Sequence, residues 1–501
     1  MFQPERGSEF IMRIVFASSE TVPFSKTGGL ADVAAGLTKA LSAAGHHVTL
    51  ITPHYPRLFP PDLPRLPTKA SVQVYLGAKR ITGHLLRSEF PDSKVDVVLI
   101  DQQEYFNRAS LYVEGGRDYA DNAERFLFFS RAVMEAIHRL NLAPDVIHTN
   151  DWQTGLVPAL VAHEYRKLPG CEQTANIFTI HNMAFQGRFQ RDVMGLTGMD
   201  WGHFNYHEME SYGDLNLLKT GIVFSDVVTT VSPTYAEEIT RAEFGYGLEN
   251  TLGVKFDRLL GVLNGVDTSE WNPKIDPHIA KNYDSTTAVE GKRVCKAALQ
   301  EELGLTIDPD ALLFGMVSRM ADQKGFDLIA ARIEDILKAN VQFAFLGTGE
   351  RRYEELVTNL AAENPGRISA SLVFNEGLAH RIEAGADAYL MPSRFEPCGL
   401  NQQYSLLYGT VPIAHRTGGL ADTVIDTRPE TIADGTANGF VFDEYDPNSF
   451  LTSIWQCVGS FQHDKLLWSQ LIQNGMREDR SWRRSAAEFA AIYKRAIGWL
   501  K

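Results

Sequence analysis

A six-residue motif that could bind an anion occurs twice in the chain. The sequence TGGLAD fills residues 27–32 and again 417–422, and each copy is preceded by a cation, Lys26 or Arg416. Each copy follows an apolar run and leads into a helix-compatible stretch. Glycines let a backbone approach an anion, and the first N–H groups and the dipole of a helix favour negative charge there. A Gly-Gly pair can also make a plain tight turn, but two copies that follow cations favour two anion-binding corners. The candidate binding residues are Gly28, Gly29, Thr417 and Gly418.

A second candidate site is the cation pair Arg319 and Lys324, which follows the apolar run 312–317. A guanidinium fork and an ammonium group in one loop could hold a diphosphate from two sides. The alternative is a solvated loop with two unrelated charges. The position after a predicted strand favours the binding interpretation.

The segment PSRFEPCGL, residues 392–400, places a carboxylate in an irregular turn after another predicted strand. Glu396 could bond sugar hydroxyls or balance developing positive charge, or it could only complement the dipole of the helix predicted over 400–409. We interpret Cys398 as a packing or contact residue, because the sequence indicates no base beside it.

Polar residues also end predicted strands in the first half of the chain, namely Asp151 after 145–148 and His181 with Asn182 after 176–180. Such residues can converge at one edge of a sheet. Trp152 could stack on a sugar or belong to the core. The sequence has no HExxH motif, no EF-hand loop and no DxD at a strand end, so we expect no metal and no cofactor.

The elements that must position these residues follow a repeated strand–loop–helix pattern, which predicts an α/β fold with parallel sheets. Ligands of such open sheets bind beyond the carboxyl ends of the strands. The first series of predicted strands is 13–17, 47–51, 95–100, 145–148, 176–180 and 227–231, with helices at 30–44 and 123–140. The second series is 312–317, 342–346, 371–374, 388–391 and 411–414, with a last helix at 485–499.

The length of 501 residues fits two domains. We expect a tag or cloning scar over 1–11, an N-terminal Rossmann-like domain over 12–260, a C-terminal one over 261–478, and a helix over 479–501 that returns to the first domain.

Composition narrows the class of function. The net charge of −14 disfavours nucleic-acid binding. The four cysteines form no CxxC pair, which fits a reducing compartment. No apolar run is long enough for a membrane span and no signal peptide is evident, so we expect a cytoplasmic protein without membrane contact.

Several segments together resemble bacterial glycogen synthases and plant starch synthases, the retaining glycosyltransferases that use ADP-glucose. The matching segments, in chain order, are KTGGLADV, HTNDWQTGLVP, TIHNMAFQG, VSPTYAEEI, VLNGVD, SRMADQKGFD, PSRFEPCGLNQ and RTGGLADTV. The resemblance runs from about residue 12 to the C-terminus. It implies a GT-B fold, with two Rossmann-like doubly wound domains and an interdomain cleft. The N-terminal domain would be the acceptor side and the C-terminal domain the nucleotide-sugar side.

The resemblance also implies a reaction and its residues. Glucose would pass from ADP-glucose to the non-reducing-end O4 of an α-1,4-glucan, glycogen or a maltooligosaccharide, with retention of configuration. The glycine loop at Lys26, Gly28 and Gly29 would meet the donor phosphates, and Arg319 with Lys324 would neutralise the departing diphosphate. The donor glucose would be held by Glu396, Cys398, Gly399 and Leu400. The transferred glucose would be surrounded by Asp151, His181, Asn182 and Asn264, with Tyr112 as a looser match.

Alternatives remain open at this point. The wider group of related retaining enzymes carries a second glutamate eight positions after the first, and here that position is Tyr404. Glycogen synthases of this type lack that glutamate too, so its absence does not count against activity. A double displacement would need a carboxylate behind the anomeric carbon; Asp151 is conceivable, but we favour attack from the face that the diphosphate leaves. A transferase that uses UDP-glucose, a sucrose-type synthase and a catalytically silent glucan-binding protein are the competing functions, and a glucan phosphorylase is less favoured because no pyridoxal phosphate site is evident.

Overall fold

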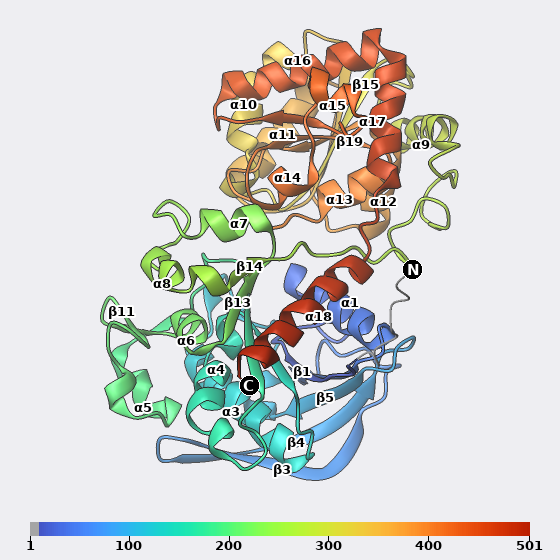
Figure 1. Ribbon diagram of the computed structural model, residues 1–501. Coiled ribbons are helices and arrows are strands. Elements are labelled where there is room, and N and C mark those ends of the chain that lie inside the picture. Colours follow the sequence, from blue (N-terminus) through green and yellow to red (C-terminus); the bar gives the residue numbers. More distant parts are fainter. Residues whose placement is uncertain (1–9, 501) are drawn as a thin grey trace, which may run out of the picture. The chain divides into compact units, whose positions relative to one another are not determined.

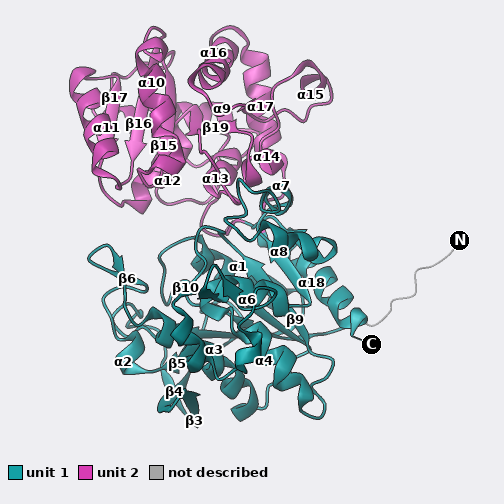
Figure 2. Ribbon diagram, turned by 90° about the vertical axis from the view of Figure 1, so that its left-hand side faces the viewer, with its two compact units in different colours: residues 1–265, 482–501 teal, residues 266–481 magenta. Residues whose placement is uncertain are grey.

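The computed structural model describes residues 10–500; residues 1–9, which hold most of the expected tag, lie outside the described residues. The chain divides into two compact units (Figure 2), residues 1–265 with 482–501 and residues 266–481. The sequence predicts these divisions at 260 and 478. The final helix belongs to the first unit.

Unit 1 is built on a nine-stranded sheet in the order β14-β13-β9-β8-β1-β2-β5-β4-β3 (Figure 1). Neighbouring strands are parallel except where β4 pairs with β3 and with β5. The strands are β1 (Arg13–Ala17), β2 (His47–Pro53), β3 (Leu66–Leu76), β4 (Lys79–Glu89), β5 (Asp96–Asp101), β8 (Val146–Asn150), β9 (Ala175–Ile180), β13 (Val227–Thr230) and β14 (Leu259–Gly261). Strands β8 and β9 are buried along their whole length, as expected for parallel strands that are covered on both faces.

The helices of unit 1 cover this sheet. They are α1 (Gly29–Ala43), α2 (Gln103–Phe106), α3 (Asn122–Arg139), α4 (Val157–His163), α5 (Met194–Thr197), α6 (Leu217–Phe224), α7 (Pro233–Glu238), α8 (Glu249–Val254) and α18 (Trp482–Trp499). Smaller strands form a ribbon and a three-stranded sheet: β6 (Val113–Glu114), β7 (Arg117–Asp118), β10 (Arg188–Phe189), β11 (Glu210–Ser211) and β12 (Asp214–Asn216).

The last helix, α18, packs against α1 (Figure 1). The contact is close at Gly36, where an added Cβ atom would lie 2.0 Å from Nε1 of Trp482. The hydroxyl of Tyr493 hydrogen-bonds Nδ1 of His148 on β8 at 2.6 Å, and Ser485 donates to the carbonyl of Leu263. The C-terminal helix therefore completes the core of unit 1.

Unit 2 has a six-stranded, fully parallel sheet in the order β17-β16-β15-β18-β19-β20. Its strands are β15 (Leu312–Val317), β16 (Val341–Leu346), β17 (Ile368–Ser371), β18 (Ala388–Met391), β19 (Val411–His415) and β20 (Phe440–Phe442). Its helices are α9 (Ala288–Glu302), α10 (Phe326–Ile336), α11 (Arg351–Glu363), α12 (Glu376–Gly385), α13 (Asn401–Leu407), α14 (Gly418–Thr423), α15 (Pro429–Ala433), α16 (Pro447–His463) and α17 (Lys465–Arg477).

The prediction of a strand over 371–374 is wrong. The edge strand β17 ends at Ser371, and Phe374 beyond it is 92% exposed. In the described part of the chain, no helix is long and apolar enough to cross a bilayer.

Candidate functional site

Both large sheets reverse their strand order at the strand that precedes a candidate loop. In unit 1, β1 lies between β2 and β8, and in unit 2, β15 lies between β16 and β18. In unit 2 the later strands extend outward in sequence order, β16 and β17 on one side and β18, β19 and β20 on the other. Open α/β sheets hold ligands in the crevice at such a reversal. Most candidate residues lie in loops that follow β1, β8 and β9 in unit 1 and β15, β18 and β19 in unit 2, whereas Tyr112 lies between α2 and β6 and Asn264 lies after β14.

In unit 1, the first glycine motif joins β1 to the N-terminus of α1. Gly28 is the N-cap residue of α1, and a Cβ atom added to Gly29 would meet no atom within 4 Å. The ammonium group of Lys26 pairs with the carboxylate of Asp32 at 2.8 Å. This exposed loop keeps open space beside its glycines, as an anion-binding corner requires.

The structure adds Glu20 to this corner, a residue that the sequence analysis did not single out. Both the backbone N–H and the hydroxyl of Thr27 donate to its carboxylate, at 2.5 and 2.8 Å. Burial raises the pKa of Glu20 to about 7. The sequence offers one signal that could have identified Glu20: it is the only carboxylate between β1 and the two glycines.

Asp151 and His181 lie together beyond the ends of β8 and β9. The backbone N–H of His181 donates to the carboxylate of Asp151 at 2.8 Å, and its ring Nε2 hydrogen-bonds the side-chain oxygen of Asn150 at 3.0 Å. Burial raises the pKa of Asp151 to about 7 and lowers the pKa of His181 to about 3. The one N–H of a neutral His181 ring is donated to Asn150, which leaves Nδ1 as an acceptor.

The other candidates of unit 1 differ in their surroundings. Trp152 is 9% exposed and packs edge-on against two phenylalanine rings, so it belongs to the core. The side-chain oxygen of Asn182 accepts from a backbone N–H two residues further on. The hydroxyl of Tyr112 lies 2.7 Å from that of Ser19, just beyond β1. Asn264 is buried near the end of the unit.

In unit 2, the structure brings two separately predicted sites together. The ammonium group of Lys324 lies 2.5 Å from the carboxylate of Glu396, which also accepts a hydrogen bond from Ser393 at 3.0 Å. Glu396 is 8% exposed, whereas Arg319 is exposed. These residues follow the neighbouring strands β15 and β18, so a cation and a carboxylate meet at the strand reversal.

The two loops that carry these residues are packed as one body. Gly325 has φ 77°, and a Cβ atom there would lie 2.0 Å from the carbonyl oxygen of Pro392. The side chain of Gln323 donates to the carbonyl of Phe395 at 3.0 Å. A side chain at position 325 would push the loops apart, and the ion pair between Lys324 and Glu396 would be disturbed.

Residues 398–400 complete the turn before α13. The carbonyl of Cys398 accepts from the side chain of Gln402 at 2.9 Å, and the Cys398 side chain is buried. Gly399 has φ 70°, which favours glycine, and Leu400 is the N-cap residue of α13. The sequence interpretation of Cys398 as a packing residue agrees with this environment.

The second glycine motif lies beneath this turn. Cβ atoms added to Gly418 and Gly419 would lie 2.1 Å from the carbonyl oxygen of Glu396 and 2.0 Å from that of Cys398. Thr417, the N-cap residue of α14, is 1% exposed. This copy supports the carboxylate-bearing turn through direct backbone packing.

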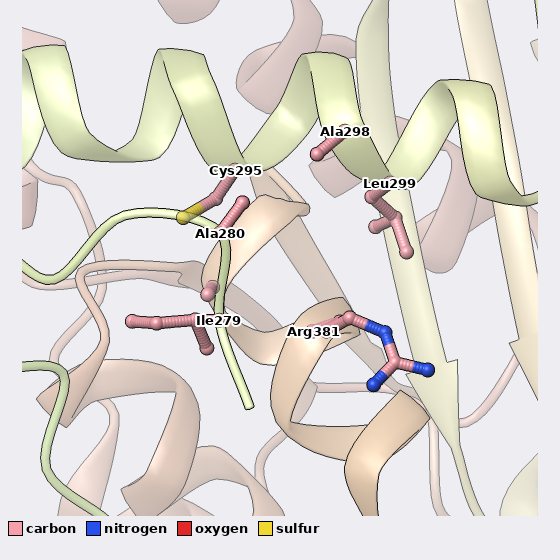
Figure 3. Close-up of a pocket in the computed structure, with 7 residues that line it drawn as sticks. Ile279, Ala280, Cys295, Ala298, Leu299 and Arg381 are labelled. Atoms are coloured by element: carbon pink, nitrogen blue, oxygen red, sulfur yellow. The ribbon is translucent and has the colours of Figure 1, made fainter. Parts of the chain in front are cut away.

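A small cavity elsewhere in unit 2 is lined mainly by apolar side chains, including Ile279, Cys295 and Leu299 (Figure 3). Its volume of about 10 Å³ is close to the smallest space that holds one water molecule. None of its lining residues is a candidate site residue, so it contributes nothing to the site.

Comparisons with known proteins match both units. Residues 13–253 match the family described as starch synthase catalytic domain, and residues 302–458 match glycosyl transferases group 1. A solved structure of the catalytic domain of starch synthase IV from Arabidopsis thaliana, bound to ADP and acarbose, has a TM-score of 0.89 and 32% identity, covering 98% of this chain and 100% of that one. Sucrose-phosphate synthase from Thermosynechococcus elongatus, at 17% identity and a TM-score of 0.59 over 97% and 99% of the two chains, shows similarity of fold alone.

The parallel α/β sheets and these structural matches identify the fold as GT-B. A glycogen synthase from Anaeromyxobacter dehalogenans is 44% identical over 96% of this chain and 99% of its own. One from Rhodopirellula baltica is 42% identical over 97% and 98% of the two chains. The chain therefore belongs to the glycogen synthase family of glycosyltransferases.

Proposed function

We propose that this enzyme transfers glucose from ADP-glucose to the non-reducing-end O4 of an α-1,4-glucan with retention of configuration. The observation that carries the proposal is the contact of Lys324 with Glu396 at the strand reversal of unit 2. A cation suited to a phosphate and a carboxylate suited to sugar hydroxyls stand side by side there. The starch synthase IV structure, which contains ADP and acarbose, supports a nucleotide and a glucan-like acceptor as ligands.

We assign the donor to unit 2. Arg319 is exposed at the end of β15 and can turn its guanidinium fork toward a diphosphate. Lys324 adds a point charge, and the turn with Glu396, Cys398, Gly399 and Leu400 would hold the glucose.

We assign the acceptor side to unit 1. Asp151, His181, Asn182, Asn264 and Tyr112 would surround the transferred sugar. The open glycine loop with Lys26 would approach the donor phosphates through its backbone N–H groups.

The transfer would proceed by same-face attack. The bond between the anomeric carbon and the phosphate oxygen breaks, the acceptor O4 bonds to that carbon, and the proton of O4 passes to the departing phosphate oxygen. The protein would contribute alignment and preorganised positive charge. We propose that this step needs no metal and no cofactor, so a chelator should leave turnover unchanged.

The direct experiment compares glucose transfer to glycogen from ADP-glucose and from UDP-glucose, with the linkage and anomer of the product determined. Transfer from ADP-glucose to form α-1,4 bonds is expected. Transfer from UDP-glucose alone would overturn the donor assignment, and glycogen binding without transfer from either donor would indicate a silent glucan-binding protein.

The role of Lys324 can be tested separately. Loss of one preorganised charge at the leaving group typically costs about 2.7–4 kcal/mol, so Lys324→Ala should lower kcat by about 10²–10³. Lys338→Ala is the matched control, because Lys338 also pairs with a carboxylate at 2.7 Å in unit 2 but lies on the surface. If the Lys324 variant retains its fold and turns over at nearly the normal rate, the assignment is wrong.

A further inference from the structure

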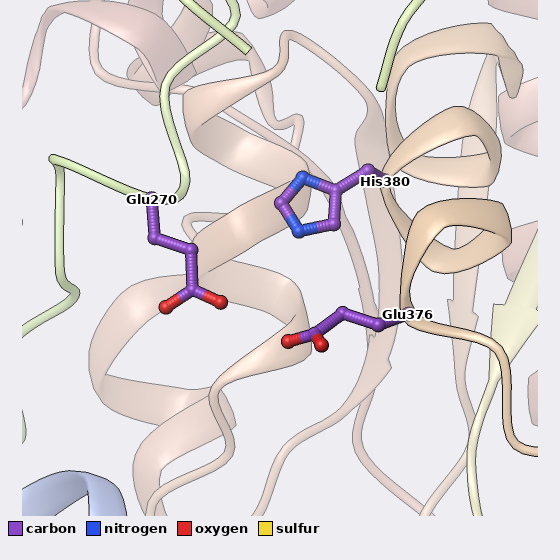
Figure 4. A group of neighbouring side chains, drawn as sticks. All are labelled: Glu270, Glu376 and His380. Carbon is purple, nitrogen blue, oxygen red and sulfur yellow. The ribbon is translucent and has the colours of Figure 1, made fainter. Parts of the chain in front are cut away.

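Three side chains of unit 2 form a group that lies outside the proposed glucosyl-transfer site. The ligand atoms of Glu270, Glu376 and His380 lie within 4.8 Å of one another. Glu376 and His380 are four residues apart on α12, so they project from one face of the helix. Figure 4 shows one ring nitrogen of His380 turned toward the two carboxylates. The group therefore combines a nitrogen ligand with two oxygen ligands.

The imidazole of His380 is held in one orientation from behind. Its Nδ1 hydrogen-bonds the carboxylate of Asp276 at 2.7 Å, and both side chains are almost completely buried. The hydroxyl of Tyr408 donates to the same carboxylate oxygen at 2.5 Å. With Nδ1 bound to Asp276, Nε2 is the ring nitrogen of His380 that remains for a ligand.

The second ring nitrogen of His380, Nε2, has different surroundings from Nδ1. His380 is 1% exposed, and its Nε2 has no hydrogen-bond partner within residues 10–500. Its ring stacks on Trp271 with centroids 3.8 Å apart, and Trp271 stacks in turn on Tyr404 at 3.9 Å. The ring cannot readily turn to find another partner. A bound cation can satisfy a buried ring nitrogen that has no partner and lies beside two carboxylates.

We propose that Glu270, Glu376 and His380 bind a divalent transition-metal ion of the Zn²⁺ class. Imidazole nitrogen with carboxylate oxygen suits such ions, whereas Mg²⁺ and Ca²⁺ prefer oxygen ligands alone. The contact of Asp276 with Nδ1 is the arrangement by which proteins orient a metal-binding histidine. The two glutamates are exposed, so water can fill the remaining coordination positions. The ion would tie the segment of Glu270 to α12 within unit 2.

The sequence analysis expected no metal site because the chain lacks the common metal-binding motifs, and this group belongs to none of those motifs. The spacing of Glu376 and His380 is a helical ligand pair, but Glu270 is far away in sequence. The proposal does not depend on the glucosyl-transfer function, because none of the three residues has a role in that site.

Isothermal titration of the chelator-treated full chain with Zn²⁺ tests the proposal. We expect one ion per chain. Glu376→Gln and Glu270→Gln should each weaken Zn²⁺ binding at least about tenfold, which is the lower end of the loss that follows removal of an outer-shell partner. His278→Gln is the matched control: this exposed histidine has its ring 4.9 Å from that of His380 but is not in the group. Its loss should leave the affinity within about twofold, well below the effect of an outer-shell partner.

A second readout is the thermal midpoint with and without Zn²⁺, since an ion that binds only the folded chain stabilises it by about 2.7 kcal/mol at 100 times its Kd. The midpoint should rise for the unaltered chain and for His278→Gln, and much less for the two glutamate variants, which keep their fold because both positions are on the surface. Absence of stoichiometric binding, or binding that survives both glutamate substitutions, would overturn the proposal.

Discussion

The two copies of TGGLAD have the same sequence but opposite surroundings. In the first copy the residues from Thr27 to Gly29 are solvent-accessible, and an added Cβ atom on Gly29 would meet nothing within 4 Å. In the second copy Gly418 and Gly419 are buried, and the same addition would place a Cβ atom about 2 Å from a backbone oxygen. Only the first copy leaves room for a ligand to approach its glycines.

The groups that lie against each copy also differ. The first copy rests on the carboxyl group of Glu20, which accepts two hydrogen bonds from Thr27. The second rests on the carbonyl groups of Glu396 and Cys398. The local sequence determines the strand–loop–helix turn in both cases. The surrounding chain decides whether the glycines serve a ligand or the packing of another loop.

The largest expected effect comes from an alanine in the packed copy. Gly419→Ala would force its Cβ atom against the carbonyl of Cys398 at 2.0 Å, and overpacking of this severity should cost about 3 kcal/mol or more. Gly29→Ala, at the first position of α1, should leave the thermal midpoint unchanged or slightly raised. Differential scanning calorimetry of both variants measures the difference.

The same pair of variants separates folding from activity. Gly29→Ala should lower kcat/KM for the donor by about tenfold, or 1.4 kcal/mol, because its new methyl group enters the space proposed for the phosphates. Equal stability losses in the two variants would show that the space beside Gly29 is filled in solution. The difference between an open first copy and a packed second copy would then be wrong.

The carboxyl group beneath the first copy gives a pH-dependent effect. Burial raises the pKa of Glu20 from 4.5 to about 7, so between these values the folded chain holds a proton that the unfolded chain releases. Stability from this group is complete below pH 4.5 and falls as the pH rises toward 7. Glu20→Gln removes the dependence, and at pH 7.5 the variant should be more stable than the unaltered chain by up to about 3 kcal/mol.

Chemical denaturation between pH 4 and pH 8 checks this expectation. The two proteins should converge at pH 4 and diverge as the pH rises. Glu355→Gln is the control, because that carboxylate is 58% exposed in a surface ion pair and should give no divergence. A constant difference at all pH values would mean that Glu20 is ionised in the folded state, and the first copy would then rest on a negative charge.

The sequence predicted the central strands well because they are continuous apolar runs. The runs 13–17 and 312–317 became β1 and β15 with the same bounds. The long hairpin of β3 and β4 was missed, since its residues alternate between exposed and buried and form no continuous apolar run. The edge strand β17 was placed too late because the apolar residues that follow it, such as Phe374, point into solvent.

The site was predictable only as separate segments. Arg319, Lys324 and Glu396 could be chosen because each follows an apolar strand, but the contact of Lys324 with Glu396 joins residues 72 positions apart and depends on β15 lying beside β18. Glu20 gave no motif at all; its importance comes from burial, which a single sequence does not display. The opposite surroundings of the two glycine motifs were likewise invisible, because they depend on which loop packs against each copy.

The smallest expected effect distinguishes the cations that precede the two copies. Lys26 pairs with Asp32 and Arg416 with Asp443, and all four side chains are at least partly exposed, so neither pair should matter much for stability. If only the open copy meets the donor, Lys26→Ala should lower kcat/KM for ADP-glucose by about tenfold, or 1.4 kcal/mol. Arg416→Ala should stay within about twofold, the range of an exposed ion pair. Steady-state kinetics of both variants with glycogen as acceptor decides the matter: equal losses would place both corners against the donor, despite the buried glycines of the second.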